Sequence, residues 1–339
     1  MKRPTHLCFL FLLLIFTNCQ SDNTPSNSTD ASIFNWLYEE EALISLEITG
    51  DLAHLFAAKH ADDHYHPATI RVEKGDSILN FAIELARRGV TRRRICDFPP
   101  IKLEFSKEDL VEKGFSGFDD YKLVTHCLEG EDEFVLKEYL TYKLFNQLTD
   151  KSFRVRLAKI RYVDESGQAP DGTHFGFLIE DNKEMAARLG GNLVNPNKYK
   201  ITRLDKEQYK KMVLFQYMIG NTDWNLSKGH NIKWVQTEID GAPTPVPYDF
   251  DYCGLVNAPY AVPHPQIPID SVRQRFLQWR GKSMDELWPT YEVFKSQKEE
   301  LLKIFQLLDH LDKTAHADML NFLSPFFEKE TKEDFLTNL

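Results

Sequence analysis

The chain has 339 residues, which is enough to bury a large core and exceeds the usual size of one domain. Its composition is 42% hydrophobic and 12% aromatic, with 24 Phe and 13 Tyr, and this argues against a largely disordered protein. The formal net charge of -10 provides no excess of cations to replace phosphate counterions, so we do not expect nucleic acid as a partner.

Residues 1–19 have the pattern of a targeting segment. Two basic residues precede an apolar run, residues 7–16, that is too short to span a bilayer. The run leads to Cys19 and resembles a bacterial lipoprotein signal in which this cysteine is lipidated; a cleaved secretory signal is the alternative. Residues 20–31 are almost wholly polar and predict a disordered tether. We therefore expect a lipoprotein of the bacterial cell envelope, attached to the membrane only through its lipid, or a secreted protein.

Three cysteines lie beyond the signal: Cys96, Cys127 and Cys253. Their spacing gives neither a disulfide framework nor a zinc motif, so we expect buried free thiols, with one disulfide as the alternative. His126 precedes Cys127, but no third group supports a nucleophile pair. The segment 60–66 holds three histidines and two aspartates without helical spacing, and we expect a surface or structural role for it rather than a zinc site.

The predicted elements run from strands to helices along the chain. Alternating apolar residues predict strands, and apolar residues repeated every three to four positions predict helices. This order favours an α+β protein with a two-lobed, protein-kinase-like fold, a β-rich N-lobe at residues 32–181 and a mainly helical C-lobe at residues 182–339. The predicted strands are residues 69–72, 80–85, 101–105, 123–126, 154–163, 174–179 and a hairpin at 231–235 and 244–247; the predicted helices are 131–149, 182–189, 206–219 and amphipathic helices beyond residue 269.

The most informative segment is residues 221–251. Asp223 follows a predicted helix, Asn231 opens the predicted hairpin, and Asp249 and Asp251 follow its second strand. Carboxylate and amide oxygens are the ligands that Mg²⁺ prefers, and a carboxylate can also orient a reacting hydroxyl. The segment therefore predicts phosphoryl or nucleotidyl transfer; the alternative is that these side chains only cap turns and helices.

These motifs resemble those of protein-kinase-like folds, and specifically the spore-coat kinase CotH family. The resemblance implies that Asp223 is the catalytic base or hydroxyl-orienting residue. It further implies that Asn231 and Asp249 bind Mg²⁺ (or Mn²⁺), with Asp251 as a second carboxylate near the same ion. The resemblance covers residues 67–251 and is carried by Arg88-Gly89-Val90-Thr91-Arg92, Phe175-Gly176-Phe177-Leu178-Ile179-Glu180, Gly220-Asn221-Thr222-Asp223, His230-Asn231 and Pro247-Tyr248-Asp249-Phe250-Asp251.

The resemblance also implies residues that bind ATP. The Lys pair usual in the family is missing here, so the cation that contacts phosphate is Lys102, Lys122 or one of residues 92–94, and we favour Lys122. Glu138 on the following helix is expected to pair with that lysine. Glu180 ends the strand that leads to the expected nucleotide hinge. A solvated surface is the alternative for the arginine run at 92–94.

Together these implications describe a lipid-anchored, CotH-like atypical kinase. It would use ATP with Mg²⁺ or Mn²⁺ to phosphorylate Ser or Thr of an envelope or secreted protein. Two alternatives stay open. One is a pseudokinase scaffold, favoured by the missing Lys pair and by the scarcity of ATP outside the cytoplasm. The other is an enzyme that transfers AMP or another group, which needs the same metal ligands.

Overall fold

The computed structural model describes residues 31–39, 43–57, 64–169, 172–199, 203–238 and 241–337. The predicted signal, the lipidation site Cys19 and nearly all of the predicted tether lie outside the described residues. So does most of the histidine-rich segment 60–66.

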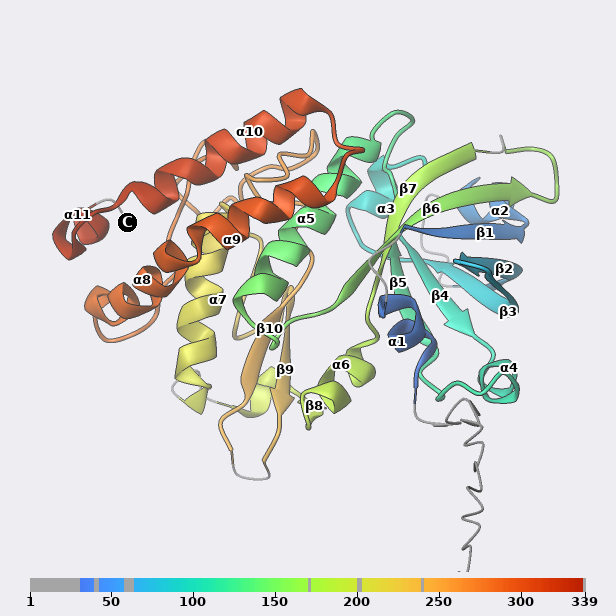
Figure 1. The fold of residues 1–339 in the computed structure, drawn as a ribbon, viewed down its shortest axis with the longest axis horizontal. Coiled ribbons are helices and arrows are strands. Elements are labelled where there is room, and N and C mark those ends of the chain that lie inside the picture. The colour runs from blue at the N-terminus through green and yellow to red at the C-terminus, as the bar shows by residue number, and fades with distance from the viewer. Residues whose placement is uncertain are drawn as a thin grey trace, which may run out of the picture.

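Seven strands close into a barrel, which occupies the right half of Figure 1. Neighbouring strands are antiparallel except β1 and β6, which are parallel, and the order around the barrel is β1-β2-β3-β4-β5-β7-β6. Alternate residues of the strands are buried, as in the burial pattern of β4, because successive side chains of a strand point to opposite faces. The strands are β1 (Ile44–Gly50), β2 (His66–Lys74), β3 (Ser77–Arg87), β4 (Ile101–Phe105), β5 (Asp120–Val124), β6 (Val155–Asp164) and β7 (Gly172–Ile179).

The predicted two-lobed, protein-kinase-like α+β fold is wrong. The strands of the first half form a closed barrel, and a closed barrel core does not fit a β-rich N-lobe set against a helical C-lobe. Closure depends on the parallel pairing of β1 with β6, in which Ile44 lies beside Ala158. Alternation in the sequence determines which face of a strand is buried, but it does not determine which distant strand completes the sheet.

Individual elements agree with the sequence more closely than the fold does. The helices predicted at 131–149 and 206–219 are α5 (Asp132–Leu148) and α7 (Lys206–Met218), and the predicted hairpin is β9 (Ile232–Gln236) with β10 (Thr244–Pro247). The short helices of the first half were not predicted. They are α1 (Ile33–Tyr38), α2 (Leu52–Ala57), α3 (Arg92–Ile95) and α4 (Lys107–Glu112).

Helix α5 lies between the barrel and the second half of the molecule (Figure 1). It is buried on most sides, as its apolar repeat predicts, and it packs against β7 of the barrel. A second sheet has the order β10-β9-β8, and α7 packs against β10. The remaining elements are α6 (Asn182–Arg188), β8 (Asn192–Val194), α8 (Trp288–Ser296), α9 (Lys298–Lys303), α10 (Lys313–Leu323), α11 (Lys332–Thr337) and the 3₁₀ turns η1 (Pro196–Lys198), η3 (Met284–Leu287), η4 (Ile304–Leu307) and η5 (Ser324–Glu328).

The cysteines differ from the sequence-based prediction. Cys96 and Cys127 form a disulfide, so these two are not free thiols, and Cys127 is not a nucleophile. Cys253 is a buried free thiol, as predicted. The disulfide joins the residue that follows α3 to the loop that follows β5.

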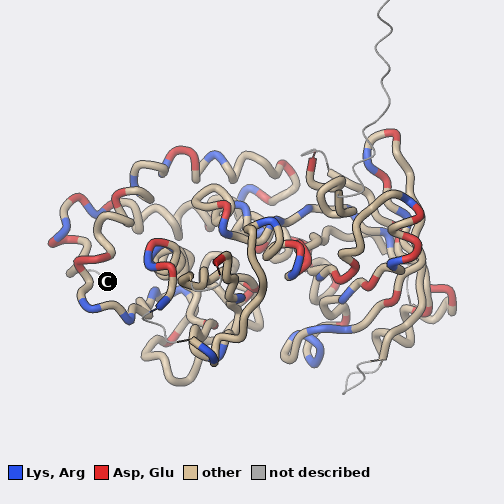
Figure 2. The backbone as a smooth tube through the Cα atoms, turned by 90° about the horizontal axis from the view of Figure 1, so that it is seen from below, with Lys and Arg blue, Asp and Glu red and all other residues tan. Residues whose placement is uncertain are grey.

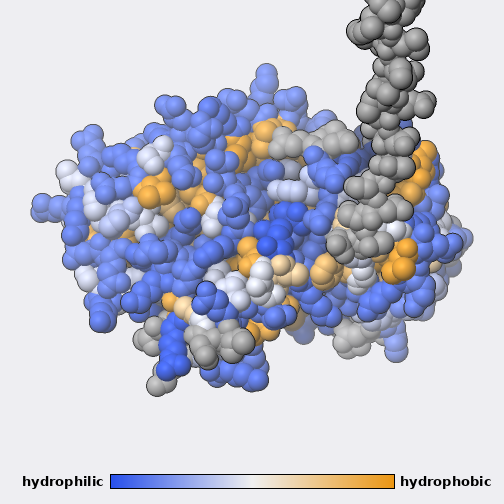
Figure 3. Space-filling model, turned by 60° about the horizontal axis from the view of Figure 1, so that its bottom comes forward, coloured by the Kyte–Doolittle hydropathy of each residue, from blue (hydrophilic) through white to orange (hydrophobic). Residues whose placement is uncertain are grey.

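The surface carries charges of both signs. Figure 2 shows acidic and basic residues interspersed along the whole trace rather than separated onto opposite faces. The face seen in Figure 3 is largely hydrophilic, with scattered apolar residues. Within the described ranges, no helix combines the length and the apolar character needed to cross a membrane.

Candidate functional site

The candidate site begins where α7 ends. Gly220 has a φ of 67°, a left-handed conformation that turns the chain away from the helix. A Cβ at this position would lie 2.9 Å from Phe322 and 3.1 Å from the carbonyl oxygen of Val272, so close packing also requires glycine. The next residue, Asn221, is buried, and its Oδ1 accepts a hydrogen bond from the backbone N–H of Asp223 at 2.9 Å. These contacts fix the backbone that carries Asp223.

Two polar side chains orient the carboxylate of Asp223. Its Oδ1 lies 3.0 Å from Nε2 of His230, and its Oδ2 accepts a hydrogen bond from Nδ2 of Asn231 at 3.0 Å. Asn231 also donates to the backbone carbonyl of Asp223 at 2.7 Å. The hydrogen bond to Asp223 raises the pKa of His230, which favours the charged imidazolium. The carboxylate is 31% exposed, so it is fixed in direction and still accessible.

A surface hollow of about 620 Å³ adjoins this carboxylate. Asp223 and Asn231 line it together with Tyr248, and Arg280 and Lys228 contribute positive charge to its wall. A hollow of this size accepts a side chain or part of a small ligand. The hydroxyl-orienting role predicted for Asp223 requires such access.

The hairpin brings the remaining predicted ligands to the same region. The backbone N–H of Tyr248 donates to the carbonyl of Asn231 at 3.0 Å, and the strand register pairs Ile232 with Pro247. Asn231 and Asp249 therefore flank one end of the hairpin. Both have positive φ, 54° and 65°, which non-glycine residues seldom adopt and which is frequent at functional positions.

Three carboxylates gather between this hairpin end and α5: Glu138, Asp249 and Asp251. We call them the acidic cluster. Glu138 is 2% exposed, and its Oε1 accepts a hydrogen bond from the backbone N–H of Phe250 at 3.3 Å. The backbone N–H of Asp249 donates to the Tyr142 hydroxyl at 2.7 Å. Glu138 and Tyr142 both lie on α5, so this helix positions the Asp249 segment.

Arg92 is the cation buried with the acidic cluster. Its NH1 lies 3.9 Å from Oε2 of Glu138, and its NH2 donates to the backbone carbonyl of Thr125 at 2.6 Å. Burial lowers the pKa of Arg92, but its electrostatic interactions with Tyr260, Asp251 and Glu138 outweigh that effect and raise it. The interpretation of the 92–94 run as a solvated surface is therefore wrong for Arg92, which is 8% exposed.

One arginine does not compensate three carboxylates. Burial, and then the charge of Asp249, raises the pKa of Asp251 to about 7. Burial, followed by the charges of Asp251 and Asp249, also raises the pKa of Glu138. Such mutual shifts mean that a further cation would stabilise the ionised cluster. The donor set is all oxygen, so the residues fit a hard ion such as Mg²⁺ or Mn²⁺.

The charge of Asp249 also acts on His230, and the charge of Asp223 acts on Asp251. The acidic cluster and the Asp223–Asn231 pair are thus electrostatic neighbours. The structure brings all four predicted catalytic and metal-binding residues into one region. Their convergence on a single ion stays a prediction.

Basic side chains lie beside the acidic cluster. Burial, and then the charge of Arg88, lowers the pKa of Lys122 to about 8, and the same two causes lower the pKa of Lys233. Arg88 also acts electrostatically on Glu138. The Nζ of Lys122 donates to Oδ1 of Asn182 at 2.8 Å, a neutral partner. Two desolvated lysines and an arginine that repel one another favour binding of an anion.

Two predicted contacts of Glu138 and Glu180 differ in the structure. Glu138 lies near Arg92, whereas Lys122 contacts Asn182, so the expected pairing of Lys122 with Glu138 is not formed. Glu180 is fully buried, and its two oxygens accept hydrogen bonds from the guanidinium groups of Arg154 and Arg188. The Glu180 side chain therefore joins β7 to α6, and its predicted role in ATP binding stays untested.

Sequence reasoning missed several residues of the site. Lys233 was not considered, because an isolated basic residue in a sequence gives no sign of its neighbours, and Arg88 was quoted as part of a motif without a role of its own. His230 lies directly before Asn231 in one of the motifs named above, so its presence in the site could have been predicted from the sequence. The contacts of Arg92 could not be predicted, because they depend on how α3 packs beside α5.

Comparison with models of known protein families finds no family that matches the chain, and comparison with curated proteins finds no match either. The resemblance to the CotH family therefore depends on the motifs of this chain alone.

Proposed function

We propose that this protein is a CotH-like atypical kinase that transfers a phosphoryl group from ATP to Ser or Thr of an envelope or secreted protein. The observation that carries the proposal is the electrostatic proximity of a basic group of residues to the acidic cluster, through the effect of Arg88 on Glu138. The acidic cluster has more negative charge than Arg92 can compensate, and near it lie Arg88 and two lysines with lowered pKa values, Lys122 and Lys233. A magnesium polyphosphate has the complementary charges.

The chemistry of each side chain indicates its proposed role in binding the metal ion or the phosphates. Asp249, Asp251 and Asn231 offer oxygen ligands to Mg²⁺ or Mn²⁺, which when bound neutralises phosphate charge. Arg88 and Lys122 would hold the phosphate oxygens. Desolvation of Lys122 supports this role, because a poorly hydrated ammonium gains more from an anion than a solvated one does.

Asp223 would orient the acceptor hydroxyl and take its proton. Its two hydrogen bonds, from Asn231 and with His230, hold the carboxylate in one direction before any substrate arrives. Such preorganisation lowers the barrier because no rearrangement is needed during the reaction. Attachment through Cys19 would keep the enzyme at the membrane surface, near exported substrates.

The test is calorimetric titration of the purified protein with ATP, with and without Mg²⁺, followed by intact-mass measurement after incubation. We expect ATP to bind only with Mg²⁺, and the protein or an added Ser/Thr substrate to gain the mass of a phosphate. Asp249→Asn should abolish both effects, and the exposed-site control Asp309→Asn should retain them.

Two other outcomes of this experiment would favour the alternative functions. Absence of metal-dependent ATP binding would reject the kinase and favour the scaffold. Gain of the mass of AMP would keep the site and change the transferred group.

A further inference from the structure

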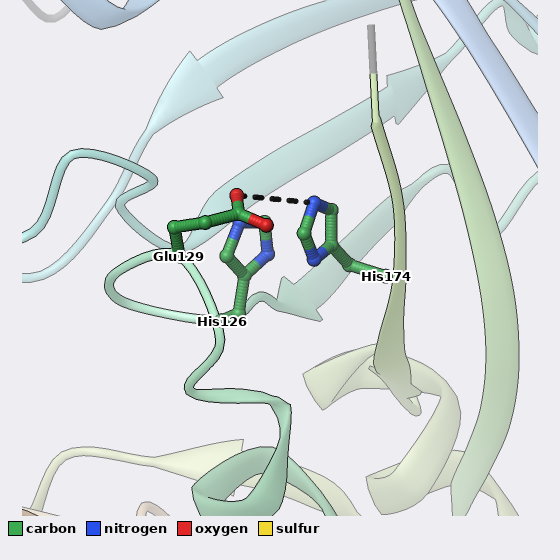
Figure 4. A group of neighbouring side chains, drawn as sticks. All are labelled: His126, Glu129 and His174. Atoms are coloured by element: carbon green, nitrogen blue, oxygen red, sulfur yellow. Dashed lines mark ion pairs between the residues drawn. The ribbon is translucent and has the colours of Figure 1, made fainter.

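A second group of side chains with metal-ligand chemistry lies in the barrel half, away from the acidic cluster. His126 follows β5, Glu129 lies in the same loop, and His174 is on β7. We call these three residues the histidine cluster. One ligand atom from each lies within 4.8 Å of the others. Figure 4 shows the two imidazole rings side by side with the Glu129 carboxylate directed toward them.

The two histidines are buried, and their polar atoms are poorly satisfied. His126 is 2% exposed and His174 is 9% exposed, and their rings stack with centres 3.6 Å apart. Among the residues that the structure describes, Nδ1 of His126 has no hydrogen-bond partner. The hydroxyl of Tyr162, whose ring centre lies 6.3 Å from that of His126, also has none. Buried polar atoms without protein partners usually contact a water or an ion.

The surroundings of His174 are those of a metal-binding histidine. Oδ1 of Asp132 lies 3.5 Å from its Nδ1, and Oε2 of Glu129 lies 3.7 Å from its Nε2. A carboxylate next to one ring nitrogen leaves the other nitrogen for a metal and orients the ring. Asp132 is itself fixed, because its Oδ1 accepts a hydrogen bond from the backbone N–H of Phe175 at 3.2 Å.

A cavity of about 1010 Å³ adjoins the histidine cluster. His126, Glu129 and His174 all line it, together with the acidic side chains of Asp51 and Asp97. Three protein ligands beside a cavity leave a coordination position open to water or a small ligand.

We propose that His126, His174 and Glu129 bind one divalent transition-metal ion. Two imidazoles and one carboxylate suit Zn²⁺ or a similar ion, whereas Mg²⁺ prefers a site made only of oxygen. Bonds of about 2.0–2.1 Å to a tetrahedral ion place ligand atoms about 3.4 Å apart. To close the 4.8 Å limit seen here, Glu129, whose side chain is 88% exposed, has room to rotate, and the stacked rings must turn so that one nitrogen of each histidine faces the ion.

The test uses the full chain without a histidine tag, stripped with EDTA and titrated with Zn²⁺. We expect one Zn²⁺ per chain by elemental analysis, and an intense visible spectrum with Co²⁺ that indicates a tetrahedral nitrogen–oxygen site. Glu129→Gln should weaken Zn²⁺ binding at least about 10-fold, because loss of a ligand costs no less than loss of a supporting contact. Because Glu129 is exposed, its substitution should not impair folding, so weaker Zn²⁺ binding would report the loss of a ligand.

Two controls separate the site from adventitious binding. His310→Gln removes an exposed histidine outside the histidine cluster and should leave stoichiometry and affinity unchanged. Asp249→Asn should also leave Zn²⁺ binding unchanged, so this proposal can fail independently of the kinase proposal. Binding of no Zn²⁺, or equal binding by Glu129→Gln, His174→Gln and the unmodified chain, would show that the rings form only a structural stack.

Discussion

The acidic cluster and the histidine cluster are both built from buried ionisable side chains, but their charges differ. In the acidic cluster burial raises the pKa of Glu138 and Asp251, and Arg92 supplies a buried positive charge. In the histidine cluster burial, and then the charges of His174 and Arg92, lowers the pKa of His126 to about 3, so its ring is neutral. Buried carboxylates therefore favour a hard cation, whereas the neutral imidazole of His126 offers a nitrogen lone pair to a softer one.

The largest effect is expected from a substitution in the acidic cluster alone. Asp249→Asn removes one proposed metal ligand while keeping the side-chain shape and the left-handed backbone, which Asn tolerates. We expect phosphoryl transfer to fall by about 1000-fold, equivalent to about 4 kcal/mol. A radiolabelled-ATP assay measures the loss. Activity within about 3-fold of the unmodified protein would remove Asp249 from the reaction.

The second prediction concerns the covalent link between the two regions. The disulfide joins Cys127, next to His126, to Cys96, directly after the helix that carries Arg92. Its partners are 31 residues apart, so reduction should lower the free energy of unfolding by about 3–4 kcal/mol. Denaturant titration with and without reductant measures this change.

Reduction should also affect the two clusters unequally. Zn²⁺ binding should weaken, because the loop that carries His126 loses its disulfide link to Cys96. Binding of Mg-ATP should change less, because Arg92 retains its hydrogen bond to the Thr125 carbonyl. The double variant Cys96→Ser, Cys127→Ser should not respond to reductant. Equal losses at both sites would mean that α3 depends on the disulfide as much as the His126 loop does.

The proximity of the Asp and Asn residues in segment 221–251 could be predicted from the sequence, but the place of Glu138 in the acidic cluster and the histidine cluster could not. Asp223, Asn231, Asp249 and Asp251 fall within one short segment, and a hairpin is a local structure whose ends must meet. His126 and His174 come together only because β5 pairs with β7, with Val124 beside Phe177. That pairing is not encoded by either strand alone.

The same distinction explains the error in the fold. Strand and helix periods are local, so β6, β7, α5 and α7 were predicted near their true positions. Closure of the barrel requires β1 to pair with β6, and the sequence of neither strand identifies the other as its partner. Lys122 and Glu138 were matched by analogy with a family, whereas packing of α3 gave Glu138 a different cation, Arg92.

The third prediction uses the titration of Asp251. The pKa of this residue is raised to about 7, because burial and Asp249 disfavour the charged form; Glu138, Arg92 and Tyr260 also act on the cluster. A raised carboxyl pKa stabilises the fold at low pH, and this stability is lost as the pH rises from about 4 to about 7. The metal-free protein should lose on the order of 1–3 kcal/mol over this range.

Mg²⁺ should oppose that loss, because it stabilises the ionised carboxylates. The increase in melting temperature caused by Mg²⁺ should therefore be larger at pH 8 than at pH 5.5. Asp251→Asn should flatten the pH dependence of the metal-free protein and reduce the Mg²⁺ effect, while Asp309→Asn should change neither. A Mg²⁺ effect that is independent of pH would separate Asp251 from the ion.

The smallest expected effect distinguishes two lysines that lie side by side on neighbouring strands of the barrel. The register of β4 and β5 pairs Lys102 with Lys122. Lys102 contacts two carboxylates, with its Nζ 3.0 Å from Glu104 and 3.2 Å from Asp120, and its pKa is raised. The Lys122 side chain donates to the neutral Asn182, and burial followed by the charge of Arg88 lowers its pKa to about 8, although the charge of Asp120 acts in the opposite direction. A lysine already compensated by carboxylates gains little from phosphate.

Lys122→Met should therefore weaken ATP binding about 10-fold, or about 1.4 kcal/mol, with Mg²⁺ binding unchanged. Lys102→Met is the matched control and should weaken it less than about 2-fold. In the unmodified protein ATP affinity should fall as the pH rises above 8, where Lys122 loses its proton, and this fall should be absent from Lys122→Met. If Lys102→Met causes the larger loss of ATP affinity, Lys102 binds the nucleotide despite its carboxylate partners, and the proposed role of Lys122 is wrong.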